Sequence, residues 1–416
     1  MKPSAYPKVS AKGDRIMERN WNIRMPYRDR DVAIETTDTS ITVDIRDARY
    51  TVVVARLAFD AVGDRFYTLS ASVEATGLSF RPLYLFRDAE GRELAKGYFM
   101  EGRRAVSPPD TATVEVEALV TSEGQGRLSM KDILLCDGGA YEPRTARVVA
   151  MSSFVTAKPD GGWFRSYETS VAETLASIDL VAEREHPDMI VLTENVFQTR
   201  LPSAEYRAYP NRLDGTDPAI VGLCERARKY RTYITCSVFE VDGEGMRHNT
   251  GLLIDRAGEI AGVYRKCQLT IGEIEGGLRP GDALAVFDTD FARIGIQVCW
   301  DHYFPESTRV LTMKGAELIC VATHGSHIER AVTRAEENGV RLAIAHTSRE
   351  ATFITAPGAT KLLDTGEEKG YAVADIDFNA PERRRYLSCD SYGASYEYYM
   401  CERRPDLYGD IGKRME

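Results

Sequence analysis

The sequence lacks the features that mark three large classes of protein. Its eight cysteines include no C-x-x-C pair, which argues against a zinc ribbon or a thiol redox motif. No stretch approaches the roughly 20 consecutive apolar residues that a membrane-spanning helix requires. The formal net charge is −10, so the chain also lacks the basic excess that is typical of nucleic-acid-binding proteins.

Signals for export are missing as well. The N-terminal stretch MKPSAYPKVSAKGDRIMERNW contains no apolar segment, so we expect no secretory signal peptide. Several cysteines lie inside apolar runs, such as Cys236 in YITCSVF and Cys320 in LICVAT, which is typical of buried free thiols. Together these observations predict a reducing, cytoplasmic compartment.

The chain has 416 residues, of which 43% are hydrophobic, and this length favours two domains. Residues 39–136 form a series of short alternating runs separated by turn signals, which predicts an antiparallel β-sandwich. The polar residues 1–38 are expected to form an arm. Residues 137–146 have the glycine, proline and polar content of a linker. The expected strands are TSITVDI, YTVVVARLAF, RFYTLSASVEA, RPLYLF, ATVEVEALV and RLSMKDILLC.

The sequence pattern changes in residues 147–416, where expected strands and helices alternate. RVVAMSSF, MIVLT, YITCSVF, TGLLID, IGIQV, ELICVAT and RLAIAHT are expected strands. Helical spacing or boundary residues predict helices over ETSVAETLASIDLVAERE, DPAIVGLCERARKY, PESTRVLTMK and RAVTRAEENG. This alternation predicts an α/β domain whose core sheet is covered by helices.

Three side chains in the α/β region interrupt this packing pattern. Glu194 directly follows the apolar run MIVLT, Lys266 lies in GVYRKCQL, and Cys299 ends IGIQVC. Each alone has an ordinary explanation: a solvated loop carboxylate, a surface lysine and a buried thiol. Taken together, they form a chemically coherent set.

A thiol, a carboxylate and an ammonium group can together cleave an amide or a nitrile. The carboxylate can accept the thiol proton as a general base, because the thiolate is the reactive form of cysteine. The ammonium group and a backbone N–H can stabilise the negative charge of the tetrahedral adduct. We expect the three residues at the ends of three strands of one sheet, where ligands of α/β sheets tend to bind.

Residues 147–416 resemble the carbon–nitrogen hydrolase (nitrilase) superfamily, whose mark is a Glu-Lys-Cys triad. Glu194 in VLTENVF, Lys266 in YRKCQL and Cys299 in GIQVCWDHYFPESTR occur in the family's order, although Thr193 and Gln268 replace the usual proline and histidine. Further landmarks are Asn249-Thr250, Pro280-Gly281-Asp282, Gly315-Ala316-Glu317, Arg334-Ala335-Glu336-Glu337-Asn338 and Arg404-Pro405-Asp406-Leu407-Tyr408. The resemblance implies an αββα four-layer sandwich.

The resemblance also suggests further site residues. A second glutamate seven residues after the lysine would be Glu273, with Glu275 as the alternative if the loop register differs. Trp300 would contribute its backbone N–H, and His324 is a candidate for substrate contact ahead of His327. The aromatic residues Phe197, Tyr303 and Phe304 are expected in the core more than in pocket walls.

The implied reaction is hydrolysis of a C–N bond through a cysteine thioester, with no metal or organic cofactor. The segment CWD followed by FPE is similar to the amidase and N-carbamoylputrescine amidase branches, so a small amide or N-carbamoyl compound is the expected substrate. The alternatives are a nitrilase, a transferase that passes the acyl group to an amine, and a catalytically inactive binding protein or scaffold.

The sandwich domain resembles jelly-roll, carbohydrate-binding-like modules only in its pattern of short strands. It is expected to bind a glycan or polymer, or to serve as a lid or dimerisation surface. Tyr67, Tyr84 and Tyr98 are open to either a binding or a packing interpretation. The family's architecture implies a homodimer or higher homo-oligomer, with the C-terminal segment YGASYEYYMCERRPDLYGDI packed on the partner subunit.

Overall fold

The computed structural model divides the chain into two compact units. Unit 1 comprises Met1–Glu142 and Arg383–Glu416, and unit 2 comprises Pro143–Glu382. Within them the structure describes residues 21–25, 32–46, 51–153, 155, 163–202, 204–325, 327–358, 362–386 and 391–413. Among these residues, no helix combines the length and the apolar character needed to cross a membrane.

Unit 1 is built around two five-stranded sheets in which every pairing is antiparallel. The first has the order β1 (Asn22–Arg24), β4 (Thr51–Asp60), β9 (Thr113–Ser122), β6 (Ser79–Arg87) and β7 (Glu93–Tyr98). The second has the order β2 (Val32–Thr37), β3 (Ser40–Ile45), β10 (Gly126–Ala140), β5 (Arg65–Thr76) and β8 (Ala105–Val106). One cluster of buried side chains, including Val43 and Val116, draws on both sheets.

The alternation of the sequence explains these strands. In β3, for example, Ile41, Val43 and Ile45 are buried while their neighbours are partly exposed, as expected when successive side chains point to opposite faces. The three tyrosines that were open to a binding role belong to the interior. Tyr67, Tyr84 and Tyr98 are 3%, 0% and 5% exposed, so they pack rather than form an exposed aromatic row.

The borders of unit 1 differ from those that the sequence predicts. The expected arm contains β1 and β2, and the expected linker begins inside β10, which runs to Ala140. Glycines in this segment suggested a linker, but they accompany a shift in strand register between Asp137 and Ala140, with Gly139 at a φ of +97°. These glycines therefore lie within an irregular part of β10 and do not mark the end of the strand.

The C-terminal segment also belongs to unit 1 and not, as predicted, to the α/β domain. It forms β23 (Arg383–Tyr386), β24 (Ser391–Ala394), α6 (Ser395–Cys401), η2 (Pro405–Leu407) and η3 (Gly409–Gly412). The Glu397 carboxylate accepts hydrogen bonds from the Tyr84 hydroxyl at 2.8 Å and from the Tyr98 N–H at 2.9 Å. Tyr398 packs edge-on against Tyr98. The part of this segment around α6 therefore packs on the chain's own sandwich.

Unit 2 contains two six-stranded sheets. The first has the order β15 (Ile260–Arg265), β14 (Arg247–Ile254), β13 (Tyr233–Val241), β12 (Met189–Val191), β11 (Thr145–Met151) and β22 (Tyr371–Asp377). The second has the order β16 (Val286–Asp288), β17 (Arg293–Val298), β18 (Leu318–Thr323), β19 (Arg341–His346), β20 (Phe353–Thr355) and β21 (Leu362–Thr365). The central strands β11, β12 and β13 are parallel, as are β17, β18 and β19.

Three clusters of buried side chains define four layers in unit 2. Helices α1 (Tyr167–Glu185) and α2 (Pro218–Tyr230) cover the first sheet, where Ile178 and Leu223 pack against strand residues. Helices α4 (Pro305–Met313) and α5 (Ile328–Asn338) cover the second sheet through Leu311 and Ala331. The third cluster lies between the sheets and includes Val191 and Ile296. The expected αββα sandwich is confirmed.

Strand direction determines which residues meet at an edge. β15 pairs antiparallel with β14, and β14 pairs antiparallel with β13, so β15 runs in the same direction as β12. The residues that follow β12 and β15 therefore lie at one edge of the first sheet. In the second sheet, β17 and β18 are parallel, so the residues that follow them also share an edge.

Candidate active site

The predicted site residues come together at strand ends, but from two sheets. Glu194 lies just after β12 and Lys266 directly after β15, in the first sheet. Cys299 directly follows β17 and opens the short helix η1 (Cys299–Tyr303), in the second sheet. The expectation that one sheet carries all three was wrong. Strand-end position was predictable from apolar runs, whereas the pairing of strands into two facing sheets was not.

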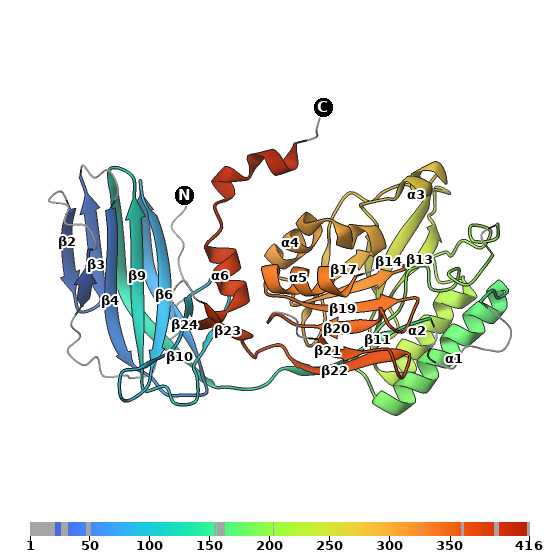
Figure 1. Cartoon of the computed structure of the whole chain (residues 1–416), viewed down its shortest axis with the longest axis horizontal. Coiled ribbons are helices and arrows are strands. Elements are labelled where there is room, and N and C mark those ends of the chain that lie inside the picture. The colour runs from blue at the N-terminus through green and yellow to red at the C-terminus, as the bar shows by residue number, and fades with distance from the viewer. Residues whose placement is uncertain are drawn as a thin grey trace. The chain divides into compact units, whose positions relative to one another are not determined.

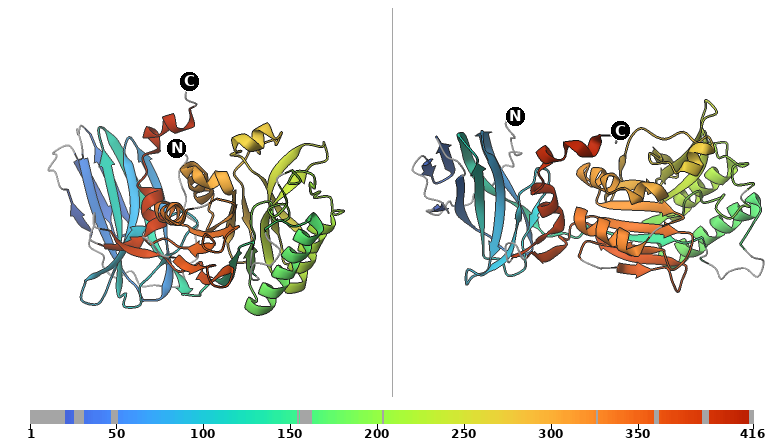
Figure 2. Two further views of the ribbon diagram at one scale, coloured as in Figure 1. Left: turned by 45° about the vertical axis from the view of Figure 1, so that its right-hand side comes forward. Right: turned by 45° about the horizontal axis from the view of Figure 1, so that its top comes forward.

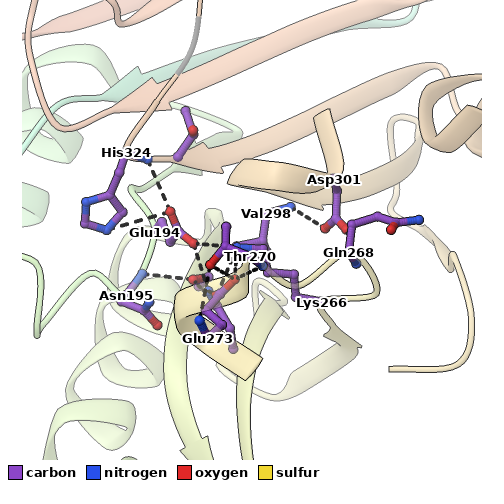
Figure 3. Close-up of polar contacts among 12 residues, drawn as sticks. Glu194, Asn195, Lys266, Gln268, Thr270, Glu273, Val298, Asp301 and His324 are labelled. Atoms are coloured by element: carbon purple, nitrogen blue, oxygen red, sulfur yellow. Dashed lines mark hydrogen bonds and ion pairs between the residues drawn. The ribbon is translucent and has the colours of Figure 1, made fainter. Parts of the chain in front are cut away.

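Lys266 is the centre of the polar network. Its ammonium Nζ donates hydrogen bonds to Glu194 Oε1 at 3.1 Å and to both carboxylate oxygens of Glu273 at 2.9 Å (Figure 3). The Lys266 side chain is 1% exposed, and burial alone would lower its pKa. The charges of Glu194 and Glu273 outweigh burial and raise the Lys266 pKa above its ordinary value. The lysine is therefore held as a buried cation.

Glu194 is held ionised by the same network. Its carboxylate also accepts hydrogen bonds from Asn249 Nδ2 at 2.8 Å and from the His324 N–H at 3.2 Å. Burial would raise the Glu194 pKa, but the charges of Lys266 and His324 and the hydrogen bonds from Lys266 and Asn249 lower it below the ordinary glutamate value. Since His324 follows β18, its N–H also joins the edges of the two sheets.

Glu273, and not the alternative Glu275, faces Lys266. Glu273 lies in the short helix α3 (Ile271–Glu275), where its carboxylate accepts hydrogen bonds from the Thr270 N–H and hydroxyl. The Thr270 side chain in turn accepts the Glu273 N–H, which completes a capping box. Asn249 Nδ2 bonds to both Glu194 and Glu273. Glu275 is exposed and makes no hydrogen bond or ion pair within the described part of the chain.

Cys299 occupies a strained turn. Its φ is +42°, in the left-handed region that residues with a Cβ rarely adopt. The side chain is half-buried and lines a cavity together with Glu194 and Lys266. Burial and the Glu194 charge raise the Cys299 pKa to about 11, against the opposing effect of Lys266. The free thiol is therefore protonated near neutral pH and needs a base to react.

Asp301 holds this turn in place. Its buried carboxylate accepts hydrogen bonds from the Val298 N–H at 3.0 Å, the Gln268 N–H at 2.8 Å and the Tyr264 hydroxyl at 2.8 Å. One side chain thus connects the end of β17 with the segment that follows Lys266. Because the contact to Gln268 is to its backbone, it does not depend on the side chain that replaces the family's usual histidine.

The cavity has a volume of about 300 Å³. Its walls are Glu194, Asn195, Tyr206, Arg207, Phe239, Lys266, Thr270, Glu273, Leu278, Cys299 and His324. Six of these wall residues were not predicted from the sequence: Asn195, Tyr206, Arg207, Phe239, Thr270 and Leu278. The Thr270-x-x-Glu273 pattern of a capping box was readable in advance. Asn249 was noted as a landmark, without the contacts it makes.

The remaining candidates differ in their positions. His324 lines the cavity, and its Nε2 lies 3.2 Å from the Thr199 hydroxyl. The Trp300 ring packs on Tyr303 and is absent from the cavity wall. His327 precedes α5 and is also absent from that wall. Phe197 is fully buried in the core, while Tyr303 and Phe304 pack around Trp300.

The sequence has relatives among known proteins. Residues 145–386 match the carbon–nitrogen hydrolase family. The chain is 31% identical over 289 residues to a citrullinase of Francisella tularensis, which covers 60% of this chain and 96% of the relative. It is 34% identical over 110 residues to the N-carbamoylputrescine amidase of Arabidopsis thaliana, which covers 26% of this chain and 36% of that enzyme.

The fold agrees with a solved structure. A double mutant of the amidase from Nesterenkonia sp. AN1, in complex with acrylamide, superimposes with a TM-score of 0.51 at 22% identity. The match covers 66% of this chain and all of the amidase chain. The family match spans more than half of the sequence and contains every cavity residue described above. The chain therefore belongs to the carbon–nitrogen hydrolase family, whose members are hydrolases of non-peptide C–N bonds.

Proposed function

We propose that the protein is a thiol amidohydrolase that cleaves a small amide or N-carbamoyl compound through a cysteine thioester. The observation that carries this proposal is the arrangement around Lys266. One buried ammonium group bonds two carboxylates in a cavity that also exposes a cysteine on a strained turn. This is the set of groups that nucleophilic attack on a carbonyl requires.

In the first half-reaction, Glu194 removes the proton from Cys299 Sγ as the sulfur attacks the carbonyl carbon. The carbonyl oxygen becomes an oxyanion, which Lys266 and the Trp300 N–H stabilise. When the tetrahedral adduct collapses, the C–N bond breaks and the Glu194 proton passes to the departing nitrogen. A thioester and ammonia or an amine result. Glu273 acts through Lys266, whose position it fixes.

In the second half-reaction, Glu194 accepts a proton from water, and the resulting hydroxide attacks the thioester carbon. The C–S bond then breaks and the proton returns to sulfur, which restores the thiol. An amide yields a carboxylic acid and ammonia. A monosubstituted urea yields ammonia and a carbamate that decomposes to an amine and carbon dioxide. Water is the only co-reactant.

The two glutamates of α3 should differ in their effect on kcat when each is changed to glutamine. Glu273→Gln removes one of the two anions that hold Lys266, so we expect kcat to fall roughly 10- to 100-fold as the ammonium group loses its fixed position. Glu275→Gln, a matched change two residues away on the same helix, should leave kcat unchanged. Steady-state ammonia release measures both. Equal effects of the two changes would remove Glu273 from the proposed mechanism.

The rate should depend little on pH near neutrality. The Glu194 pKa lies below its ordinary value, so the base is lost only when pH falls below the usual glutamate range. The Lys266 pKa is raised, so the ammonium group persists on the alkaline side. We expect kcat/KM for an uncharged amide to be flat from about pH 6 to about pH 9. A steep rise between pH 6 and pH 8 would instead indicate a base with a near-neutral pKa.

The names of the relatives support the choice of substrate class. They include the citrullinase and the N-carbamoylputrescine amidases, and also a bifunctional nitrilase/nitrile hydratase of Nicotiana tabacum. Ammonia release from primary amides, N-carbamoyl amines, N-carbamoyl amino acids and nitriles tests the proposal, with Cys299→Ala as the blank. Release from amides or ureides supports it. Turnover of nitriles alone would make the protein a nitrilase.

We also propose that unit 1 is a jelly-roll module. The order β3-β10-β5-β8 in one sheet and β4-β9-β6-β7 in the other supports this, because jelly rolls interleave their strands in this way. Binding of a glycan or polymer by this module stays a prediction, as does the homo-oligomer.

A further inference from the structure

We propose that Arg207 binds a carboxylate at the far end of the substrate, so that the preferred substrates are ω-amides or ureides that carry an acid group. This inference rests on the proposed function and specifies its substrate class.

Arg207 shares the cavity wall with Cys299 and Lys266. Lys266 and Glu194 are buried, whereas Arg207 is exposed, so the arginine belongs to the open side of the cavity. A substrate whose carbonyl carbon reaches Cys299 would therefore extend its other end toward solvent and toward Arg207.

The guanidinium is held against the backbone of α3. Its Nη2 donates a hydrogen bond to the Gly272 carbonyl at 2.8 Å. A Cβ placed on Gly276 would lie 1.9 Å from Arg207 Nη1, so a residue other than glycine at 276 would displace the side chain. Arg207 is thus positioned by the helix that also carries Glu273. Since guanidinium has five N–H donors, most of them stay available to a ligand.

The described charges around Arg207 are already paired with other groups. Within the part of the chain that the structure describes, it makes no ion pair. The carboxylates in the cavity wall belong to Glu194 and Glu273, and both already bond to Lys266 and Asn249. An exposed cation at a cavity wall that forms no ion pair with any described residue favours an anionic ligand. Guanidinium suits a carboxylate because it can donate two parallel hydrogen bonds.

The rest of the wall suits a short alkyl spacer. Phe239 and Leu278 contribute apolar surface to the same cavity. A substrate with an ammonium group at its far end would place like charge beside Arg207. The inference therefore separates this chain from a preference for N-carbamoylputrescine, whose free end is an amine.

The test compares substrates that differ only in the charge of the far end. The ureide series is 4-ureidobutyrate, N-butylurea and N-carbamoylputrescine. The amide series is glutaramate, pentanamide and 5-aminopentanamide. In whichever series is hydrolysed, kcat/KM for the acid should exceed that for the neutral compound by roughly 10- to 100-fold, the effect of one charge-assisted hydrogen bond. The amine should be the poorest substrate.

Variants of Arg207 then identify the residue responsible. Arg207→Gln should lower kcat/KM for the acid far more than for the neutral compound, because the charge-assisted contact is made by the acid alone, whereas the lost hydrogen bond to Gly272 affects both substrates equally. Arg207→Lys should keep part of the preference, and Arg207→Glu should reverse it in favour of the amine. Arg212→Gln, an exposed arginine of the same loop that is absent from the cavity wall, should leave the preference unchanged.

Two results would overturn the inference. One is equal kcat/KM for acid, neutral compound and amine in the wild type. The other is an equal loss with all three in Arg207→Gln, which would show that Arg207 acts only by holding α3. A different result, no ammonia above the Cys299→Ala blank from either series, would overturn the proposed function itself.

Discussion

Replacing Cys299 with alanine should abolish turnover, lowering the rate of ammonia release by roughly 10⁴-fold or more. The physical reason is that, among the cysteines whose placement the structure describes, Cys299 alone lines the cavity. Without the sulfur, neither the attack nor the thioester can form, although Glu194 and Lys266 stay in place. A sensitive ammonia assay with the best substrate of the panel measures the effect.

Two controls make this result specific. The Cys299→Ala protein should unfold at the same or a higher denaturant concentration, because alanine removes a half-buried thiol without leaving a buried charge unpaired. Cys224→Ala, which changes a partly exposed thiol on α2, should retain activity within about twofold. Residual activity of Cys299→Ala above one tenth of the wild type would contradict a thioester mechanism.

Replacing Lys266 with alanine should damage both activity and stability. We expect ammonia release to fall roughly 10³-fold or more, because the oxyanion loses its cation. The free energy of unfolding should fall by about 3–5 kcal/mol, since the substitution leaves the carboxylates of Glu194 and Glu273 in a buried site without their partner. Urea-induced unfolding, followed by circular dichroism, measures the second effect.

A second substitution tests the cause of the lost stability. In Lys266→Ala combined with Glu273→Gln, one of the two unpaired anions is gone, so part of the lost unfolding free energy should return while activity stays absent. Lys229→Ala breaks an exposed pair with Asp179 and should change neither property. A stable Lys266→Ala protein would contradict the pairing of the lysine with two ionised carboxylates.

Local features of the fold were predictable because they depend on neighbouring residues. The apolar runs around Ile190 and Ile296 identified strands, and helix boundaries followed from residues such as Pro218, which is the first residue of α2. The division of unit 2 into two sheets was not predictable in this way. Strand pairing depends on residues far apart in the sequence. A fully buried strand has the same apolar sequence pattern whichever of the two sheets it joins.

The candidate site also combines residues that the sequence predicts with residues that it does not. Glu194, Lys266, Cys299 and Glu273 follow motifs with fixed spacing, so their meeting at one cavity was expected. Tyr206 and Arg207 lie in the segment between β12 and α2. This segment contacts α3, and no periodic pattern in the sequence predicts that contact. Similarly, Glu397 attaches the C-terminal segment to unit 1 through Tyr84, a residue 313 positions away. No local pattern records such a contact.

Alkylation by iodoacetamide at neutral pH distinguishes a reactive Cys299 thiol from an inert one. Cys136, Cys236 and Cys320 are buried, and Cys224, Cys267 and Cys401 are partly exposed but absent from the cavity wall. Peptide mass spectrometry over time should find Cys299 modified well before the other seven cysteines, with activity lost in proportion. Slow and uniform labelling, or full activity after Cys299 is modified, would contradict the account.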